Sequence, residues 1–238
     1  MNMLKSKTAI ILLAGLLFAG SASAAVSVEQ ADRLGKDLTP MGAIKAGNAD
    51  GTIPAWDGGI TSPPAGYQKG MHHPDPYAAD KVLFTITTEN MGQYADKLTA
   101  GQQEMLKAYP SYTMNIYPTH RSASAPQRIY DATKALATKS QLVEGGNGVV
   151  GGVNGIPFPV PQCGIEVIWN HILRWRGDAF DRNFGVAPMT RGGDYTMVEF
   201  NEKGDFRYSQ QGMTEQKLQN VIAMLKQEIF APARVAGR

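Results

Sequence analysis

The stretch AGNADGTIPAWDGG, residues 46–59, contains the residue types of a calcium-binding loop. Asn48 and Asp50 offer side-chain oxygens, and the glycine after them stands where a helix-loop-helix calcium loop turns sharply. Two other ligand positions fit poorly, because Ala46 stands at the first and Asp57 at the last, where a longer glutamate usually binds. The residues that follow are rich in glycine and proline and cannot form the outgoing helix. We therefore interpret the segment as a turn, with a calcium-binding or interaction module as an alternative.

The segment MHHPDP could also ligate a metal ion, since it offers His72, His73 and Asp75. Adjacent histidines on an extended backbone point apart, and Pro74 and Pro76 favour such a backbone. We therefore predict no metal site here.

No motif of a catalytic nucleophile occurs in the chain. A G-x-S-x-G elbow and a zinc-protease helix are both missing from the sequence, and the single cysteine, Cys163, has no polarising partner nearby in sequence. We expect a protein that is not an enzyme and binds no cofactor. Carboxylates from distant segments could still meet in space, so an exported hydrolase with unassigned carboxylates stays an alternative.

A group of charged residues lies around two tryptophans, Trp169 and Trp175, and comprises Arg174, Arg176, Arg182, Asp178 and Asp181. A solvated surface of ion pairs is the ordinary interpretation of such a group. Contact with the head group of an amphiphilic ligand is the alternative, since guanidinium groups bind phosphate and carboxylate well.

The N-terminus is typical of a secretory signal peptide. Lys5 and Lys7 precede an apolar run over residues 9–18, and the small residues that end at Ala24 suit a cleavage site. The run is too short to span a bilayer, and no later segment is apolar enough. We expect residues 1–24 to be removed and the rest to be exported to the periplasm, with no transmembrane segment.

The charge of the chain gives no sign of nucleic-acid binding. The whole sequence has 23 basic and 21 acidic residues, and both lysines of the signal peptide leave with it. The remaining chain is formally neutral, whereas proteins that bind nucleic acid carry a basic patch.

Local patterns predict a mixture of helices and antiparallel strands. Ser27 and Thr99 are expected to cap helices, and Thr99 forms a capping box with Gln102. Apolar residues alternate in 81–90 and 111–118, which predicts two strands.

The second half of the chain has further patterns of both kinds. Helices are expected from Asp131 and between Gly164 and Gly177. Two strands are expected to flank the turn NEKG, residues 201–204, and a long helix to run from Thr214. The predicted class is α+β.

Several segments together resemble one family. They are LTPMGAIKAGNADGTIPAWDGG, DPYAADKVLFTITTENMGQYADKLTAGQ, YPTHRSASAPQ, GGNGVVGGVNGIPFPVP, IEVIWNHILRWRG and APARVAG. In this order they are similar to the bacterial exported proteins grouped as domain of unknown function 1329. The resemblance implies a fold similar to the LolA and LolB lipoprotein carriers, an incomplete antiparallel β-barrel with helices on its concave face.

The same resemblance implies a function. It suggests a periplasmic, non-enzymatic carrier or chaperone of a lipid or another hydrophobic molecule, working with an inner-membrane exporter of the resistance-nodulation-division type. Trp169, Trp175 and Phe200 are the candidates for the wall of the ligand site. Family members are about twice as long, so we expect residues 25–238 to be the N-terminal part of such a domain, and a non-functional truncated product is a further alternative.

Overall fold

A computed structural model describes residues 26–219 and 221–237 of the chain. These residues form two compact units. The first unit combines the N-terminal residues up to Ala43 with the chain from Pro126 onward, and the second unit spans Ile44–Ala125. The expected signal peptide lies outside the described residues. Within them, no helix is both long enough and apolar enough to cross a membrane.

The second unit is built around one helix and a small antiparallel pair of strands. Helix α2 (Ala100–Ala108) begins at Thr99, whose hydroxyl accepts from the N–H of Gln102 in the predicted capping box. Strands β1 (Phe84–Ile86) and β2 (Met114–Ile116) pair antiparallel, which confirms both predicted strands in shorter form. A 3₁₀ turn, η1 (Met91–Tyr94), lies between them in sequence.

The helical part of the first unit contains α1 (Val28–Ala31), α3 (Gln127–Leu136) and α4 (Gly164–Ile172). Ser27 caps α1 as predicted. Helix α3 begins at Gln127, before the predicted Asp131 and directly after Pro126, whose extended ψ of 148° places it outside the helix. A short hairpin of β3 (Gln141–Leu142) and β4 (Val149–Val150), joined by the turn η2 (Glu144–Gly146), follows α3.

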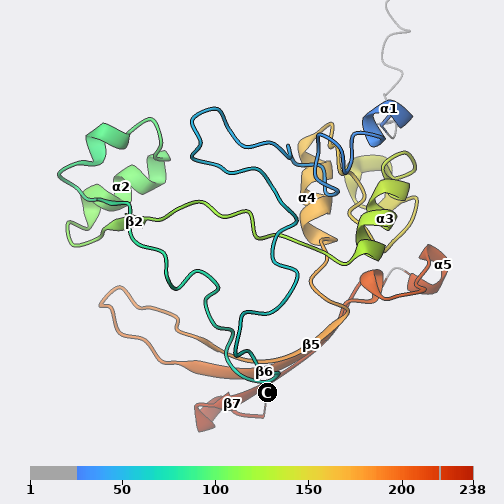
Figure 1. The fold of residues 1–238 in the computed structure, drawn as a ribbon. Helices are drawn as coiled ribbons and strands as arrows, with labels where there is room; N and C mark the ends of the chain where they lie inside the picture. Colours follow the sequence, from blue (N-terminus) through green and yellow to red (C-terminus); the bar gives the residue numbers. More distant parts are fainter. Residues whose placement is uncertain (1–25, 220, 238) are drawn as a thin grey trace, which may run out of the picture. The chain divides into compact units, whose positions relative to one another are not determined.

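The main sheet of the first unit has three antiparallel strands in the order β5-β6-β7 (Figure 1). They are β5 (Ala179–Val186), β6 (Val198–Asp205) and β7 (Met224–Ala231). The turns η3 (Arg207–Ser209) and η4 (Ala233–Val235) and the short helix α5 (Glu215–Leu218) complete the unit. Beside the sheet, the buried side chains of Phe206, Tyr208 and Leu218 form a small core.

Two predictions about this sheet are wrong. The segment NEKG is not a turn but the middle of β6, and the real hairpin joins β5 to β6 through residues 187–197. The long helix predicted from Thr214 ends after one turn at Gln219, whose φ of +52° is left-handed, and the chain then forms β7. The predicted α+β class with antiparallel strands is confirmed, and the described residues form small sheets with no closed or curled barrel.

Candidate functional site

The main sheet has one apolar face. Opposite residues of paired strands share a face, and the register places Phe184 opposite Phe200 and Phe200 opposite Ile229. The rings of Phe184 and Phe200 stack with their centroids 5.0 Å apart. The remaining apolar side chains on this side, which we call the aromatic face together with these three, are Phe180, Val186, Val198 and Leu225.

The aromatic face is only partly covered. Val186 is 44 % exposed and Leu225 is 62 % exposed, and Phe184 and Phe200 are half-buried. Exposed apolar side chains gathered on one face of a sheet are a feature of sites that bind a partner or an apolar ligand. It is the strongest candidate for a functional site in the first unit.

The opposite face of the same sheet is polar. Asn201 donates to both Asp181 and Asn183 at 2.9 Å, and Lys203 lies 3.3 Å from Asp181. The hydrogen bond from Asn201, and then the contact with Lys203, hold the pKa of the Asp181 carboxyl below its usual range. The sheet is therefore amphipathic, with the aromatic face on one side only.

An ion pair is set into the aromatic face. Arg182 Nε donates to Glu202 Oε2 across the two strands at 2.7 Å. The guanidinium also lies 5.0 Å from the ring centre of Phe180 and 4.9 Å from that of Phe184, within the range of cation–π contacts. Glu202 is buried, so Arg182 compensates the charge of a carboxylate that has lost most of its water.

Helix α4 also exposes apolar side chains. Ile165 and Ile168, three residues apart, lie on the same side of the helix and are 46 % and 59 % exposed. Val167 is 51 % exposed. Most surface helices point such residues inward, so α4 is a second apolar surface of the first unit.

The three residues predicted for a ligand-site wall lie on different segments. Phe200 belongs to the aromatic face. Trp169 lies on α4, and its indole N–H donates to the carbonyl of Gly146 at 2.9 Å. Trp175 lies between α4 and β5, and within the described residues its indole nitrogen is buried without a hydrogen-bond partner. Sequence reasoning missed Phe184 and Glu202, although the alternation of Phe180, Phe184 and Val186 with polar residues was a signal for β5.

The charged group around the tryptophans is divided among different partners. Arg182 pairs with Glu202 on the aromatic face, whereas Asp181 belongs to the polar face. Arg174 donates to a carbonyl of α4 at 2.6 Å, and Arg176 lies 4.2 Å from the ring centre of Phe206. These residues therefore do not form one binding cluster.

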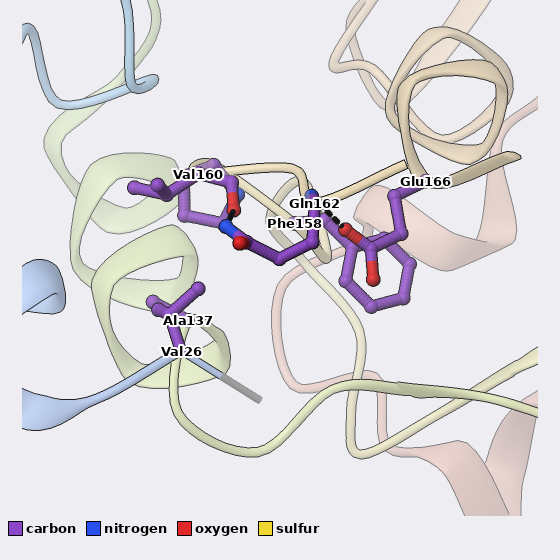
Figure 2. A pocket seen from close by; sticks show the side chains of 7 residues that line it. Val26, Ala137, Phe158, Val160, Gln162 and Glu166 are labelled. Carbon is purple, nitrogen blue, oxygen red and sulfur yellow. Dashed lines mark hydrogen bonds between the residues drawn. The ribbon is translucent and has the colours of Figure 1, made fainter. Parts of the chain in front are cut away.

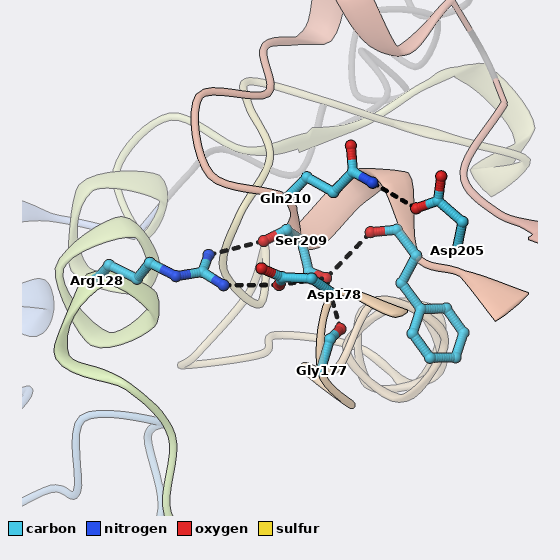
Figure 3. Close-up of polar contacts among 7 residues, drawn as sticks. Arg128, Gly177, Asp178, Asp205, Ser209 and Gln210 are labelled. Atoms are coloured by element: carbon cyan, nitrogen blue, oxygen red, sulfur yellow. Dashed lines mark hydrogen bonds and ion pairs between the residues drawn. The ribbon is translucent and has the colours of Figure 1, made fainter. Parts of the chain in front are cut away.

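Asp178 takes part in a network that ties α3 to the start of the sheet (Figure 3). Arg128 of α3 donates to Asp178 Oδ1 at 2.6 Å and to the carbonyl of Ser209 at 2.7 Å. The hydroxyl of Ser209 donates to the carbonyl of Gly177 at 2.8 Å. The network therefore joins α3, the start of β5 and η3.

A small cavity lies near the N-terminal segment of the first unit (Figure 2). Its volume is about 10 Å³, and it is lined by Val26, Ala137, Phe158, Pro159, Val160, Gln162 and Glu166. This volume suits about one water molecule and is too small for a lipid or a cofactor.

The loop with the calcium-like pattern uses its own oxygens. Asn48 Oδ1 accepts from the N–H of Ile53 at 2.7 Å. Asp50 Oδ1 accepts from the hydroxyl of Thr52 at 2.8 Å and from its N–H at 3.3 Å. These contacts support the interpretation as a turn, because two of the expected calcium ligands already bond within the loop.

Arg121 holds the same loop from outside. Its guanidinium donates to the carbonyls of Ile44 at 2.7 Å, Lys45 at 3.1 Å, Ala46 at 3.4 Å and Pro54 at 3.5 Å. One side chain therefore joins the two arms of the loop, a role that the sequence did not indicate.

The segment with His72 and His73 has local contacts. Asp75 accepts from the N–H of Tyr77 at 2.8 Å, and His73 lies edge-on to the ring of Tyr67. Over residues 26–219 and 221–237, no three histidine, cysteine or acidic side chains come together in a way that could hold a metal ion.

The comparisons with known proteins confirm the family that the sequence resembles. The family model of a protein of unknown function, DUF1329, matches residues 85–238. The chain belongs to this family. An uncharacterized protein of Pseudomonas aeruginosa, PA3922, is 46 % identical over 226 residues, which cover 94 % of this chain.

This DUF1329 chain spans about half the length of that relative, since the match covers 50 % of it. No solved structure matches the chain.

Proposed function

We propose that this chain is part of a periplasmic, non-enzymatic carrier or chaperone of a lipid or another hydrophobic molecule. The observation that carries the proposal is the amphipathic main sheet, whose aromatic face contains the stacked pair of Phe184 and Phe200 and is partly exposed. A ligand with an acyl chain would cover apolar atoms that now contact water, which favours binding.

In this proposal the main sheet is a section of an incomplete barrel similar to LolA and LolB. The aromatic face would form its concave lining, and the apolar side of α4, with Ile165 and Ile168, would cover the ligand. An exporter of the resistance-nodulation-division type would supply or receive the cargo. The secretory type of N-terminus and the formally neutral remainder of the chain support export to the periplasm.

The proposal is tested by measuring what the protein binds. Native mass spectrometry of the purified chain should show a co-purified lipid, and a fluorescent fatty acid should bind with a rise in emission. Phe184→Ser and Phe200→Ser should each weaken fatty-acid binding at least several-fold. Asn183→Ser, on the polar face of the same strand, is the matched control and should not. A protein that carries no lipid and does not bind the fatty acid would contradict the carrier function.

One pair of residues favours the hydrolase alternative. His120 Nε2 lies 2.6 Å from Asp80 Oδ2, and the imidazole stacks on the ring of Tyr77 with centroids 3.6 Å apart. A carboxylate in this position orients a histidine that acts as a general base. If the chain is a hydrolase, a screen of esters and glycosides should reveal an activity that Asp80→Asn and His120→Asn both remove. A second possible role of the pair is purely structural, and it predicts a loss of stability with no activity to lose.

A further inference from the structure

The hydrogen bonds of β5 and β6 determine which backbone N–H and C=O groups of β7 point away from β6, at the outer edge of the sheet. The N–H of Phe206, just after β6, donates to the carbonyl of Asp178, just before β5, at 2.8 Å. Backbone groups alternate in direction along a strand, so the even-numbered residues of β6 bond to β5 and its odd-numbered residues bond to β7.

The register then fixes the direction of each residue of β7. The odd-numbered residues 201, 203 and 205 of β6 lie opposite 228, 226 and 224 of β7. Leu225, Gln227 and Ile229 therefore turn their N–H and C=O groups away from β6. The carbonyl of Ile229 bears this out, because it accepts from the N–H of Gly237 and not from β6.

Side chains along β7 are left uncovered at this edge. Met224 is 59 % exposed, Leu225 62 % and Phe230 50 %. Within the described residues no further strand pairs with β7. A long edge strand with apolar side chains is a template for another strand.

The sequence of β7, MLKQEIFA, is complementary to itself when it runs antiparallel. With Gln227 on a two-fold axis, Lys226 lies opposite Glu228 of the second copy and Leu225 opposite Ile229. Met224 then lies opposite Phe230. Apart from the two Gln227 side chains on the axis, each of these pairs combines either opposite charges or two apolar side chains. The residues whose backbone groups point away from β6, 225, 227 and 229, are the ones that this register hydrogen-bonds.

We propose that β7 is a self-association edge, through which two copies of this chain pair antiparallel about Gln227 and join their main sheets into one. Such an interface is isologous, with Lys226 of each copy facing Glu228 of the other on the polar side. In the single chain Lys226 Nζ already lies 3.0 Å from Glu228 Oε1, so pairing extends this contact into a ladder of four alternating charges. On the opposite side, Leu225 and Ile229 of each copy lie opposite Ile229 and Leu225 of the other, on either side of the two Gln227 side chains.

The segment after β7 controls access to this edge. Gly237 donates to the carbonyl of Ile229 at 2.9 Å, and η4 lies between the two residues in sequence. The same carbonyl would accept from Leu225 of the second copy. Pairing therefore displaces residues 233–237 from the edge, and these residues limit association.

The test measures the mass of the purified chain by sedimentation equilibrium over a range of concentrations. We expect a monomer–dimer equilibrium with no larger species. Lys226→Glu and Glu228→Lys each place like charges opposite one another and should raise the dimer dissociation constant roughly tenfold. The double variant Lys226→Glu with Glu228→Lys restores opposite charges and should recover the dimer.

Two backbone variants separate the edge from the side chains. Gln227→Pro removes an N–H that points outward, so it should abolish the dimer without breaking the bonds between β6 and β7. Deletion of residues 233–238 should strengthen dimerisation by freeing the carbonyl of Ile229. Circular dichroism and hydrogen exchange of β6 verify that each variant is folded.

A chain that stays monomeric at all concentrations, with and without residues 233–238, would overturn the proposal. So would a dimer that is unaffected by the single charge reversals, or one that the double variant fails to restore. Binding of the fluorescent fatty acid is measured in parallel. If Gln227→Pro is monomeric and still binds the fatty acid, dimerisation through β7 and fatty-acid binding are independent of each other.

Discussion

Arg182 and Glu202 lie directly opposite each other on β5 and β6, and the guanidinium of this ion pair contacts the rings of Phe180 and Phe184 on the aromatic face. The carboxylate side chain is 10 % exposed, whereas the arginine side chain is 59 % exposed. The arginine thus shields the carboxylate on the sheet and keeps its own contact with water.

Removing only the arginine should cost stability. Arg182→Met leaves Glu202 without its partner, and we expect a loss of about 1–2 kcal/mol, below the range for fully buried pairs because Arg182 is half in water. The double variant Arg182→Met with Glu202→Gln should recover a large part of this loss, since no buried charge remains. Urea unfolding at neutral pH measures both. If the single and double variants lose the same free energy of unfolding, the charge of Glu202 does not destabilise the fold when Arg182 is absent.

The stacked rings of Phe184 and Phe200 should be energetically coupled. Alanine at either position removes the ring contact, and a double-mutant cycle should give a coupling energy of about 0.5–1 kcal/mol. The four proteins are compared by urea unfolding. Strictly additive losses would mean that the 5.0 Å stack contributes nothing beyond the burial of each ring.

Arg121 should control the order of the loop around residues 44–57. Arg121→Lys keeps the charge but cannot reach four carbonyls at once, so amide hydrogen exchange in this loop should accelerate at least tenfold. Helix α3, which belongs to the first unit, serves as the internal reference. Unchanged exchange in the loop would show that its own turns are sufficient to hold it.

Asp50 should titrate below an ordinary aspartate. The hydroxyl of Thr52, and then its backbone N–H, lower the pKa of the Asp50 carboxyl by bonding to the charged form. The resulting stabilisation is present above the unfolded pKa of about 3.9 and is lost as the pH falls through the lower pKa of the folded state.

The variant Thr52→Val tests this assignment. It removes the hydroxyl, and the pKa of Asp50 should rise toward its ordinary value in an NMR titration of the side-chain carboxyls. Asp37, whose pKa is lowered by the guanidinium of Arg33, is the control and should not move. If Asp50 titrates identically in both proteins, the loop is held by other contacts.

Features that depend on neighbours in sequence could be predicted. Ser27 and Thr99 cap their helices because a hydroxyl three residues before a backbone N–H reaches it in any protein. The strands β1 and β2 followed from short apolar alternation, although only three residues of each pair.

The main sheet could not be predicted in the same way. Gly204 looked like a turn residue, but in the sheet it lies opposite Phe180, whose ring occupies the space that a Cβ would need. A helical period also fits Leu218, Val221, Leu225 and Ile229, yet the helix ends at the left-handed residue Gln219 and a strand begins at Met224. In both cases a contact with a distant strand decided the structure, and the local pattern was compatible with two outcomes.

The candidate site shows the same limit. Phe200 is one of the predicted wall residues, but its stacking partner Phe184 and the ion pair beside it depend on the register of β5 and β6. The burial of the Glu202 carboxylate could not be predicted from its neighbours in sequence, because it results from strand pairing.

Cys163 is the only cysteine of the chain, and its side chain is exposed at the start of α4. A maleimide dye can therefore be attached at one defined position without any substitution, two residues from Ile165. A polarity-sensitive dye there would act as a built-in reporter of whether the apolar side of α4 becomes dry when a lipid is added. The emission of a dye at Cys163 would therefore follow binding of the proposed ligand over time.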